Sequence, residues 1–522
     1  MKTRRIIWAD DEIELLKPHI IFLQEHGYDV TAVTNGNDAV ELVRKHRFDV
    51  VLLDEMMAGM DGLTALLEIK AHDPLLPCVL ITKSEEESLM EEAIGRKIDD
   101  YLTKPVNPSQ ILLACKKLID AKSIAEQKLA QKYISQLQDY SSRLAQDPDW
   151  TDFTDIYVSI TEIELELDKH PDLGLNQTLE DQKAELNVAF AQYVESSYPG
   201  WVKGENPPLL SPNIVREYVI PRLLEKSEKV LFLVIDCLRL DQWMVLESQL
   251  REYFHIKRDT YYSILPTATP YSRNSIFAGM YPADIEKSYP ELWARGTADE
   301  TSTNRYERQF LDRQLEINGV RLKPEHKYIK VMDSEESESV ARRIKSLQNL
   351  PFVSMVWNFI DILGHTRSSS DILKEIVPDE AAYRSVVGVW FKHSPLLRIL
   401  KAWAENGGTV VLTTDHGAIR GRRSAKVHSD RDASHGLRYK SGRNLRADEK
   451  QAIFIADPAS YRLPQGNMNS NYILAREDYY FVYPTNYNKY AQLYHDGFQH
   501  GGVTMEEMIL PVVILESRKS GR

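Results

Sequence analysis

Short apolar runs alternate with amphipathic stretches over residues 1–121, and this alternation constrains the fold of the N-terminal part more than any other feature. Strands separated by helical segments are joined by crossovers, which place the strands parallel in one sheet with helices on its faces. We therefore expect a doubly wound α/β domain. The predicted strands are Arg5–Ala9, Val30–Val33, Val50–Leu53, Cys78–Ile81 and Tyr101–Leu102.

Polar residues follow several of these runs. Asp10 and Asp11 follow the first run, Asp54 the third, Thr82 the fourth and Lys104 the fifth. A doubly wound sheet gathers the carboxyl ends of its strands at one edge, so these side chains should meet. Three carboxylates form a hard-oxygen site for Mg2+, beside which Asp54 can accept a phosphoryl group as a nucleophile. The alternative for any single aspartate is that it caps the following helix.

The segment DEMMAGMDG from Asp54 to Gly62 closely resembles the phosphorylation loop of response-regulator receiver domains, and the resemblance extends over residues 1–121. Ala58 stands where proline is usual, which should alter a loop and leave the chemistry in place. The resemblance implies a flavodoxin-like fold and phosphorylation of Asp54 by a sensor histidine kinase. It places in the site the Mg2+ ligands Asp10, Asp11, Asp54 and Met56, the switch pair Thr82 and Tyr101, and the phosphoryl-binding Lys104.

The middle of the chain, residues 122–215, has few strand-like runs and places apolar residues at helical spacing. Turn signals at residues 147–149, 170–172 and 199–200 divide it into several helices, so we expect a helical bundle that acts as a spacer. Strand patterns resume after it, which predicts a large α/β domain over residues 216–522. The predicted strands are Val230–Ile235, Phe352–Trp357, Thr409–Leu412, Ala452–Ala456 and Val512–Leu515.

Residues of the metal-ligand type follow three of these later strands, and one histidine lies near the end of the chain. Carboxylates and imidazoles without cysteine pairs suit catalytic Zn2+. Two of them, four residues apart, share one face of a helix. Each has an ordinary alternative as a helix cap or as a core or loop histidine. The candidate ligands are Asp236, Asp361, His365, Asp415, His416 and His500, and His495 is a rival to the last of them.

A nucleophile is expected in the segment from Pro266 to Arg273, where either Thr267 or Thr269 supplies the hydroxyl. The order of these residues resembles the alkaline phosphatase superfamily, and the segment through Pro282 resembles its nucleotide phosphodiesterase branch. The resemblance favours Thr269 as the nucleophile. It implies two zinc ions, one held by Asp361, His365 and His500, and the other by Asp236, Asp415, His416 and Thr269.

A basic stretch from Arg420 to Arg443 follows the third predicted strand end. In an acidic chain it can form a rim that binds the phosphates of an extended substrate. Arg438 and Lys440 are named as candidate substrate contacts. The alternative is a solvated loop.

Receiver, spacer and a terminal phosphatase-like domain of the PglZ kind together resemble PorX-type response regulators, which are linked to type IX secretion. The resemblance implies homodimerisation on phosphorylation and a zinc-dependent phosphodiesterase that acts on nucleotides or on linear and cyclic oligonucleotides. Preference for a diester is expected because no third metal set is evident, although Arg273 leaves open a clamp for a monoester. The alternative is a zinc-containing effector or nucleotide sensor without activity, which acts by binding a sigma factor or a secretion-system component.

The composition narrows the remaining classes of function. A net charge of −13 and the lack of a basic helix-turn-helix pattern argue against a duplex-DNA-binding domain. No apolar run reaches about 18 residues, so no membrane insertion is expected. Three widely spaced cysteines and the absence of a signal-peptide pattern lead us to expect a cytoplasmic protein.

Overall fold

The computed structural model describes residues 4–83, 98–224, 228–293, 306–368, 370–430, 433–465 and 470–518. Its contacts divide the chain into two compact units. The first comprises residues 1–137 and 169–173, and the second comprises residues 138–168 and 174–522. We describe each unit by itself.

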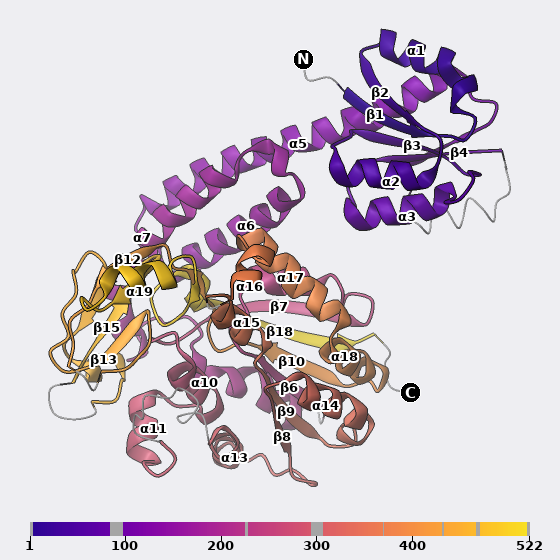
Figure 1. Cartoon of the computed structure of the whole chain (residues 1–522). Coiled ribbons are helices and arrows are strands. Elements are labelled where there is room, and N and C mark those ends of the chain that lie inside the picture. The colour runs from indigo at the N-terminus through magenta and orange to yellow at the C-terminus, as the bar shows by residue number, and fades with distance from the viewer. Residues whose placement is uncertain are drawn as a thin grey trace. The chain divides into compact units, whose positions relative to one another are not determined.

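The first unit contains a five-stranded parallel sheet in the order β2-β1-β3-β4-β5, as the alternation predicted (Figure 1). Its strands are β1 (Arg4–Ala9), β2 (Tyr28–Val33), β3 (Val50–Asp54), β4 (Cys78–Thr82) and β5 (Asp100–Thr103). Helix α1 (Lys17–Glu25) and the start of α5 (Pro108–Leu144) pack on one face, and α2 (Gly36–Lys45) and α3 (Gly62–His72) on the other. Because both faces are covered, β3 and β4 are buried along their whole length.

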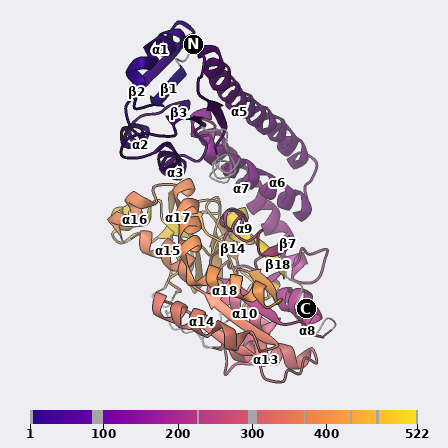
Figure 2. The ribbon, with the colours of Figure 1, turned by 90° about the vertical axis from the view of Figure 1, so that its right-hand side faces the viewer.

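The spacer is helical, as predicted. Figure 2 shows α5 as one long helix, and α6 (Trp150–Lys169) and α7 (Asn176–Trp201) follow it. The expected turn at Pro199 and Gly200 is wrong, because both residues lie in the last turn of α7. Proline cannot donate to the Glu195 carbonyl, and the Tyr461 hydroxyl donates to that carbonyl instead, at 3.4 Å.

The second unit is built on a six-stranded mixed sheet in the order β7-β18-β10-β6-β9-β8. Four of its strands match predicted runs, and β18 is antiparallel to both of its neighbours. β7 and β8 were not predicted, because β7 mixes charged and aromatic residues and β8 is short and contains two lysines. The strands are β6 (Val230–Ile235), β7 (Phe254–Tyr262), β8 (Lys327–Val331), β9 (Phe352–Trp357), β10 (Thr409–Thr413) and β18 (Ile509–Ser517).

Helices cover both faces of this sheet. One face packs against α9 (Leu240–Glu247), α14 (Ser334–Leu347), α17 (Glu380–His393) and α18 (Pro395–Glu405). The other packs against α8 (Ile220–Leu224), α10 (Thr269–Ala278) and α13 (Glu307–Ile317). β6 and β10 are adjacent and parallel, so the residues that follow them lie side by side.

The segment between β10 and β18 forms small sheets beside the large one (Figure 1). The predicted strand at Ala452–Ala456 becomes β14 (Ala452–Ile455) in one of these sheets and does not join the large sheet. Part of the basic stretch also forms strands here, β11 (Ile419–Arg420), β12 (Arg423–Lys426) and β13 (Tyr439–Gly442). Within the described residues, no helix combines the length and the hydropathy needed to span a membrane.

Candidate phosphorylation and metal sites

The first site lies at the carboxyl edge of the five-stranded sheet. Asp10, Asp11 and Asp54 each offer an oxygen within 4.8 Å of the others. The Lys104 Nζ lies 2.6 Å from Asp54 Oδ1 and 3.1 Å from Asp10 Oδ2. Burial raises the pKa of Asp54, the nearby Asp10 adds to the rise, and the Lys104 ammonium opposes it. A divalent cation would relieve this concentration of negative charge, so the triad fits Mg2+.

The other receiver residues lie around this triad. Thr82 ends β4, and its hydroxyl donates to the Glu55 carboxylate. Tyr101 lies on β5 and Met56 in the loop after β3, and both residues are exposed. Gly62 approaches the backbone closely, since a Cβ there would lie 2.2 Å from the Asp54 carbonyl oxygen. The glycine therefore lets the start of α3 pack against the end of β3.

A first group of metal-type ligands in the second unit is buried at the ends of β6 and β10. Asp236 directly follows β6, and Asp415 and His416 follow β10 after one residue. The His416 Nε2 lies 3.6 Å from Asp236 Oδ1 and 3.7 Å from Asp415 Oδ2. Neither of these carboxylate oxygens has a hydrogen-bond partner within the described part of the chain. Two buried oxygens that face one imidazole nitrogen fit a metal ion.

A second group joins α15 (Phe359–Arg367) to the segment after β17 (Phe498–Gln499). Asp361 Oδ1 lies 3.2 Å from His365 Nε2, which lies 3.2 Å from His500 Nε2. The third side of this triangle, from His500 Nε2 to Asp361 Oδ1, is 3.7 Å. Ligand atoms at about 2.0 Å from a tetrahedral zinc ion are about 3.3 Å apart, so this spacing fits the ion.

The second nitrogen of two histidines orients its ring. His416 Nδ1 lies 3.1 Å from the Gly417 carbonyl oxygen, and His500 Nδ1 lies 3.3 Å from that of Thr267. A proton on each Nδ1 donates to the carbonyl and leaves the Nε2 lone pair for a metal. The two rings stack with their centroids 4.0 Å apart, which brings the two groups side by side.

Burial and mutual repulsion set the charges of these groups. Burial raises the pKa of Asp236 and Asp415 above the ordinary range, against the opposing charge of Arg273. Burial and the neighbouring His500 lower the pKa of His416. At Asp361 burial acts to raise the pKa, but the hydrogen bond and charge of His365 outweigh it and the pKa is lowered. The two buried carboxylates at β6 and β10 thus favour a bound cation.

The two candidate threonines have different surroundings. The Thr269 hydroxyl lies 2.9 Å from His416 Nε2, at the first residue of α10, where the helix dipole favours negative charge. The Thr267 hydroxyl donates to the Gly502 carbonyl at 2.8 Å and accepts from the Gly501 N–H at 3.1 Å. Thr267 therefore holds the loop that carries His500, and Thr269 is the threonine that faces the ligand groups.

Arg273 lies one turn after Thr269 on α10 and is buried. Its Nη1 donates to Asp236 Oδ2 at 2.5 Å, and its Nε donates to Glu307 Oε1 at 2.6 Å. These two carboxylates hold the guanidinium in place next to Asp236, a member of the first ligand group. Arg273 thus holds Asp236 in place.

The remaining candidates lie outside both ligand groups. His495 is more than half exposed and lies 3.1 Å from Asp496. Arg438 is buried and donates through Nε and Nη2 to Glu507, both at 2.8 Å. Lys440 is also buried, and its Nζ donates to the Ser434 carbonyl at 3.1 Å. Neither Arg438 nor Lys440 presents its charge to solvent, so we do not include them among the proposed substrate contacts.

Lys440 is expected to lower stability at neutral pH. Burial lowers the pKa of Lys440 from its ordinary 10.5 to about 8. The folded chain then binds fewer protons at this site than the unfolded chain, so stability rises as the pH increases from 8 to 10.5. Lys440→Met should raise the free energy of unfolding at pH 7 by about 2–3 kcal/mol, and the gain should shrink at pH 10. Chemical denaturation at both pH values measures the unfolding free energy, with Lys426→Met, at an exposed lysine, as the control. An equal gain at pH 7 and pH 10 would contradict the lowered pKa of Lys440.

Comparison with known families covers most of the chain. Residues 6–116 match the response regulator receiver domain, and residues 214–515, more than half of the chain, match the BREX system PglZ alkaline phosphatase-like domain. Residues 123–202 match the PorX response regulator linker domain. The chain is a PorX-type response regulator of the PglZ family.

Solved structures similar to this PorX-type chain match its receiver part. The receiver domain of NtrX from Brucella abortus is 26% identical, with 22% of this chain and 98% of that chain covered and a TM-score of 0.21. The receiver domain of the Francisella response regulator 1452 is 24% identical, with 23% and 98% covered and a TM-score of 0.22.

Two acidic residues that support the site of this PorX-type chain were not predicted from its sequence. Glu307 anchors Arg273, and no local pattern marks it, because the two residues are far apart in the chain. Glu507 accepts from Arg438 and from the Gly502 N–H at 2.8 Å, next to His500. The spacing of Thr504 and Glu507 is that of a capped helix start, which the structure shows, and it offered a signal for Glu507.

Proposed function

We propose that this chain is a response regulator phosphorylated on Asp54 whose output domain is a zinc-dependent phosphodiesterase. Its substrates are nucleotides or oligonucleotides, cyclic ones included, and the activity serves regulation of type IX secretion. The observation that carries the proposal is the Thr269 hydroxyl, 2.9 Å from His416 Nε2 and beside two adjoining groups of metal-type ligands. A buried hydroxyl in that position can act as the nucleophile that attacks phosphorus.

In the proposed reaction, one set of residues binds the zinc ions and Thr269 attacks the phosphorus. Asp236, Asp415 and His416 would hold one zinc ion, and Asp361, His365 and His500 the other. Bound zinc supplies Lewis acidity that favours the alkoxide and stabilises the leaving oxygen. Thr269 Oγ1 loses its proton, forms a bond to phosphorus and displaces the ester alcohol, whose oxygen takes up a proton as it leaves. Water then hydrolyses the phosphothreonine diester, which releases a phosphate monoester and returns a proton to the Thr269 hydroxyl.

Specificity for a diester is supported by the surroundings of Thr269. A phosphate monoester carries an additional charge, which requires a further cation. Within the described ranges, the second unit has two groups of at least three metal-type ligands, and Arg273 is already paired with Asp236 and Glu307. We therefore expect the zinc-loaded chain to hydrolyse bis(p-nitrophenyl) phosphate with a higher kcat/KM than p-nitrophenyl phosphate. The reverse order would contradict the diester preference, and a screen of linear and cyclic oligonucleotides would then define the substrate.

The receiver is the proposed switch of this output. We place the three domains at residues 1–121, 122–215 and 216–522, with Mg2+ held by Asp10, Asp11, Asp54 and the Met56 carbonyl, and with Thr82, Tyr101 and Lys104 responding to phosphorylation. The chain would act in the cytoplasm as the target of a sensor histidine kinase and form a homodimer when phosphorylated. Binding to a sigma factor or secretion component is the alternative output.

Asp54→Asn is expected to abolish dimerisation driven by acetyl phosphate. Asparagine cannot form the acyl phosphate, but it has nearly the shape of aspartate and should leave the structure around the triad unchanged. Light scattering after gel filtration, with Mg2+ and acetyl phosphate, should show a dimer for the wild type and a monomer for the variant. Asp29→Asn, an exposed aspartate on β2, serves as the matched control and should dimerise. A variant at Asp54 that still dimerised on addition of the phosphodonor would contradict the switch.

A further inference from the structure

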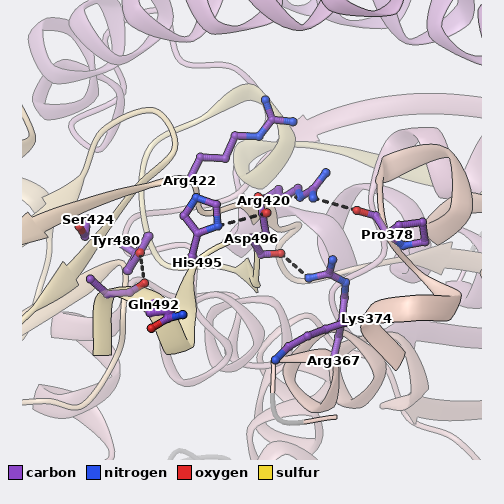
Figure 3. A pocket seen from close by; sticks show the side chains of 11 residues that line it. Arg367, Lys374, Pro378, Arg420, Arg422, Ser424, Tyr480, Gln492, His495 and Asp496 are labelled. Atoms are coloured by element: carbon purple, nitrogen blue, oxygen red, sulfur yellow. Dashed lines mark hydrogen bonds and ion pairs between the residues drawn. The ribbon is translucent and has the colours of Figure 1, made fainter. Parts of the chain in front are cut away.

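A cavity of about 580 Å3 opens in the second unit apart from the two ligand groups. Neither Thr269 nor any of the six metal-type ligands lines it. The cavity brings together α15 and α16 (Asp371–Ile376), the loop around β11, and the end of α19 (Tyr487–Tyr494). Figure 3 shows its charged lining residues, which are Arg367, Lys374, Arg420, Arg422, His495 and Asp496.

The lining is strongly cationic in a chain whose net charge is −13. Three arginines and one lysine line the cavity, against the single carboxylate of Asp496. Arg367 and His495 both contact Asp496, and the Nε of Arg420 lies 3.1 Å from Asp496 Oδ1 (Figure 3). Arg422 and Lys374 pair with carboxylates outside the lining, so the lining itself contains more cations than carboxylates.

Within the described residues, no carboxylate forms a close ion pair with Arg367, whose hydrogen bonds go to backbone carbonyls. Its side chain is 4% exposed, and it donates to two backbone carbonyls, those of Val377 at 2.6 Å and Asp496 at 2.5 Å. A second guanidinium, that of Arg420, lines the same cavity. A buried guanidinium held by carbonyls beside a second guanidinium is stabilised by an anion.

The other three cations of the lining differ in how firmly their side chains are held. Arg420 is held because its Nη2 donates to the Pro378 carbonyl at 2.8 Å. Arg422 pairs with Glu180 at 2.9 Å, and Lys374 pairs with Asp371 at 3.3 Å. Both of these side chains are more than a third exposed, so they can turn toward a ligand at little cost. The cavity thus offers two arginines held by backbone carbonyls and two partly exposed cations beside them.

We propose that this cavity binds a small phosphate-bearing ligand of nucleotide size at a site separate from the metal ligands. Guanidinium groups match the geometry of phosphate oxygens, and the volume lies within the range of about 300–1,000 Å3 usual for small-ligand sites. Arg367 follows His365 by two residues, Arg420 follows His416 by four, and Asp496 precedes His500 by four. The same segments therefore carry the metal-type ligands and the cavity lining. A ligand bound in the cavity can thus change the position of the metal-type ligands on which the proposed function rests.

The test titrates the zinc-loaded full-length chain with ADP, and separately with inorganic phosphate, by calorimetry. Arg422→Gln and Lys374→Gln remove partly exposed cations and do not threaten the fold. Each should weaken binding of ADP at the cavity about tenfold, the usual loss for one hydrogen bond to a charged group. Arg398→Gln is the matched control, because Arg398 pairs with Glu338 on the surface outside the cavity. Its affinity for ADP should equal that of the wild type.

The outcomes separate this proposal from the proposed phosphodiesterase. A parallel loss of ADP and phosphate affinity supports a site that recognises the phosphate group alone, and a loss confined to ADP supports one that also contacts the nucleoside. Unchanged ADP affinity in Arg422→Gln, Lys374→Gln and the double variant overturns the proposal. Hydrolysis of a chromogenic diester, measured on the same samples, should not fall in the cavity variants. A wild type that binds ADP here but hydrolyses no diester would overturn the proposed function and leave this site standing.

Discussion

Thr269→Ala is expected to reduce hydrolysis of a chromogenic phosphodiester by a factor of about a thousand or more, while the chain keeps its metal and its fold. The substitution removes one methyl group and the hydroxyl, whose oxygen lies 2.9 Å from His416 Nε2. Without the hydroxyl, no bond from residue 269 to phosphorus can form, so the two-step route through phosphothreonine is lost. Initial rates with bis(p-nitrophenyl) phosphate, together with metal analysis and circular dichroism, measure the three expectations.

Two controls make the Thr269 experiment decisive. Thr269→Ser keeps a hydroxyl at the same place and should retain most of the activity. Thr267→Ser keeps the hydroxyl that holds Gly501 and Gly502, so it should retain metal and activity as well. Undiminished turnover in Thr269→Ala would place the nucleophile elsewhere, and loss of metal in that variant would assign the hydroxyl a mainly structural role.

Arg273→Gln is expected to lower the unfolding free energy of the chelator-treated chain by about 3–5 kcal/mol. The guanidinium is 2% exposed, and it lies 2.5 Å from Asp236 Oδ2 and 2.6 Å from Glu307 Oε1. Its loss removes the cation closest to both carboxylates, leaves Glu307 only the more distant Lys330 at 3.9 Å, and takes from Asp236 the contact that orients it. Chemical denaturation measures the stability, and zinc titration should show weaker binding by the variant.

The Arg273 experiment also distinguishes two roles for the residue. Arg308→Gln, which alters an exposed arginine on α13 paired with Asp312, is the control and should change neither quantity appreciably. If Arg273 instead contacted substrate phosphate, Arg273→Gln would keep zinc affinity and stability and lose activity mainly toward monoesters. That result would overturn its assignment as a positioning residue.

The receiver fold could be predicted from the sequence because its determinants are local. Each strand is a short apolar run, and Asp10, Asp54, Thr82 and Lys104 each follow one at the same edge of a parallel sheet. The topology then brings them together without any information on distant pairs. The metal-type ligands at β6 and β10 were found for the same reason, since these strands are adjacent and parallel.

The remaining features depend on contacts between distant segments. Arg438 was expected to contact substrate from a basic rim, but it is buried and pairs with Glu507, which lies 69 positions away in the chain. Glu307 has no pattern that points to Arg273. β7 shows a weak apolar alternation because it is the edge strand of the sheet, paired with β18, and is buried only in part. Charge pairing across the fold, which no local window contains, decides which basic residues face solvent.

Metal analysis of the purified full-length chain tests the central claim most directly. Protein equilibrated with buffered Zn2+ and freed of excess ion should contain about two zinc ions per chain. Replacing His365 and His500 together by alanine should remove one of them, because the group at β6 and β10 remains. A wild-type content near zero, or an unchanged content in the double variant, would contradict the account of the two ligand groups.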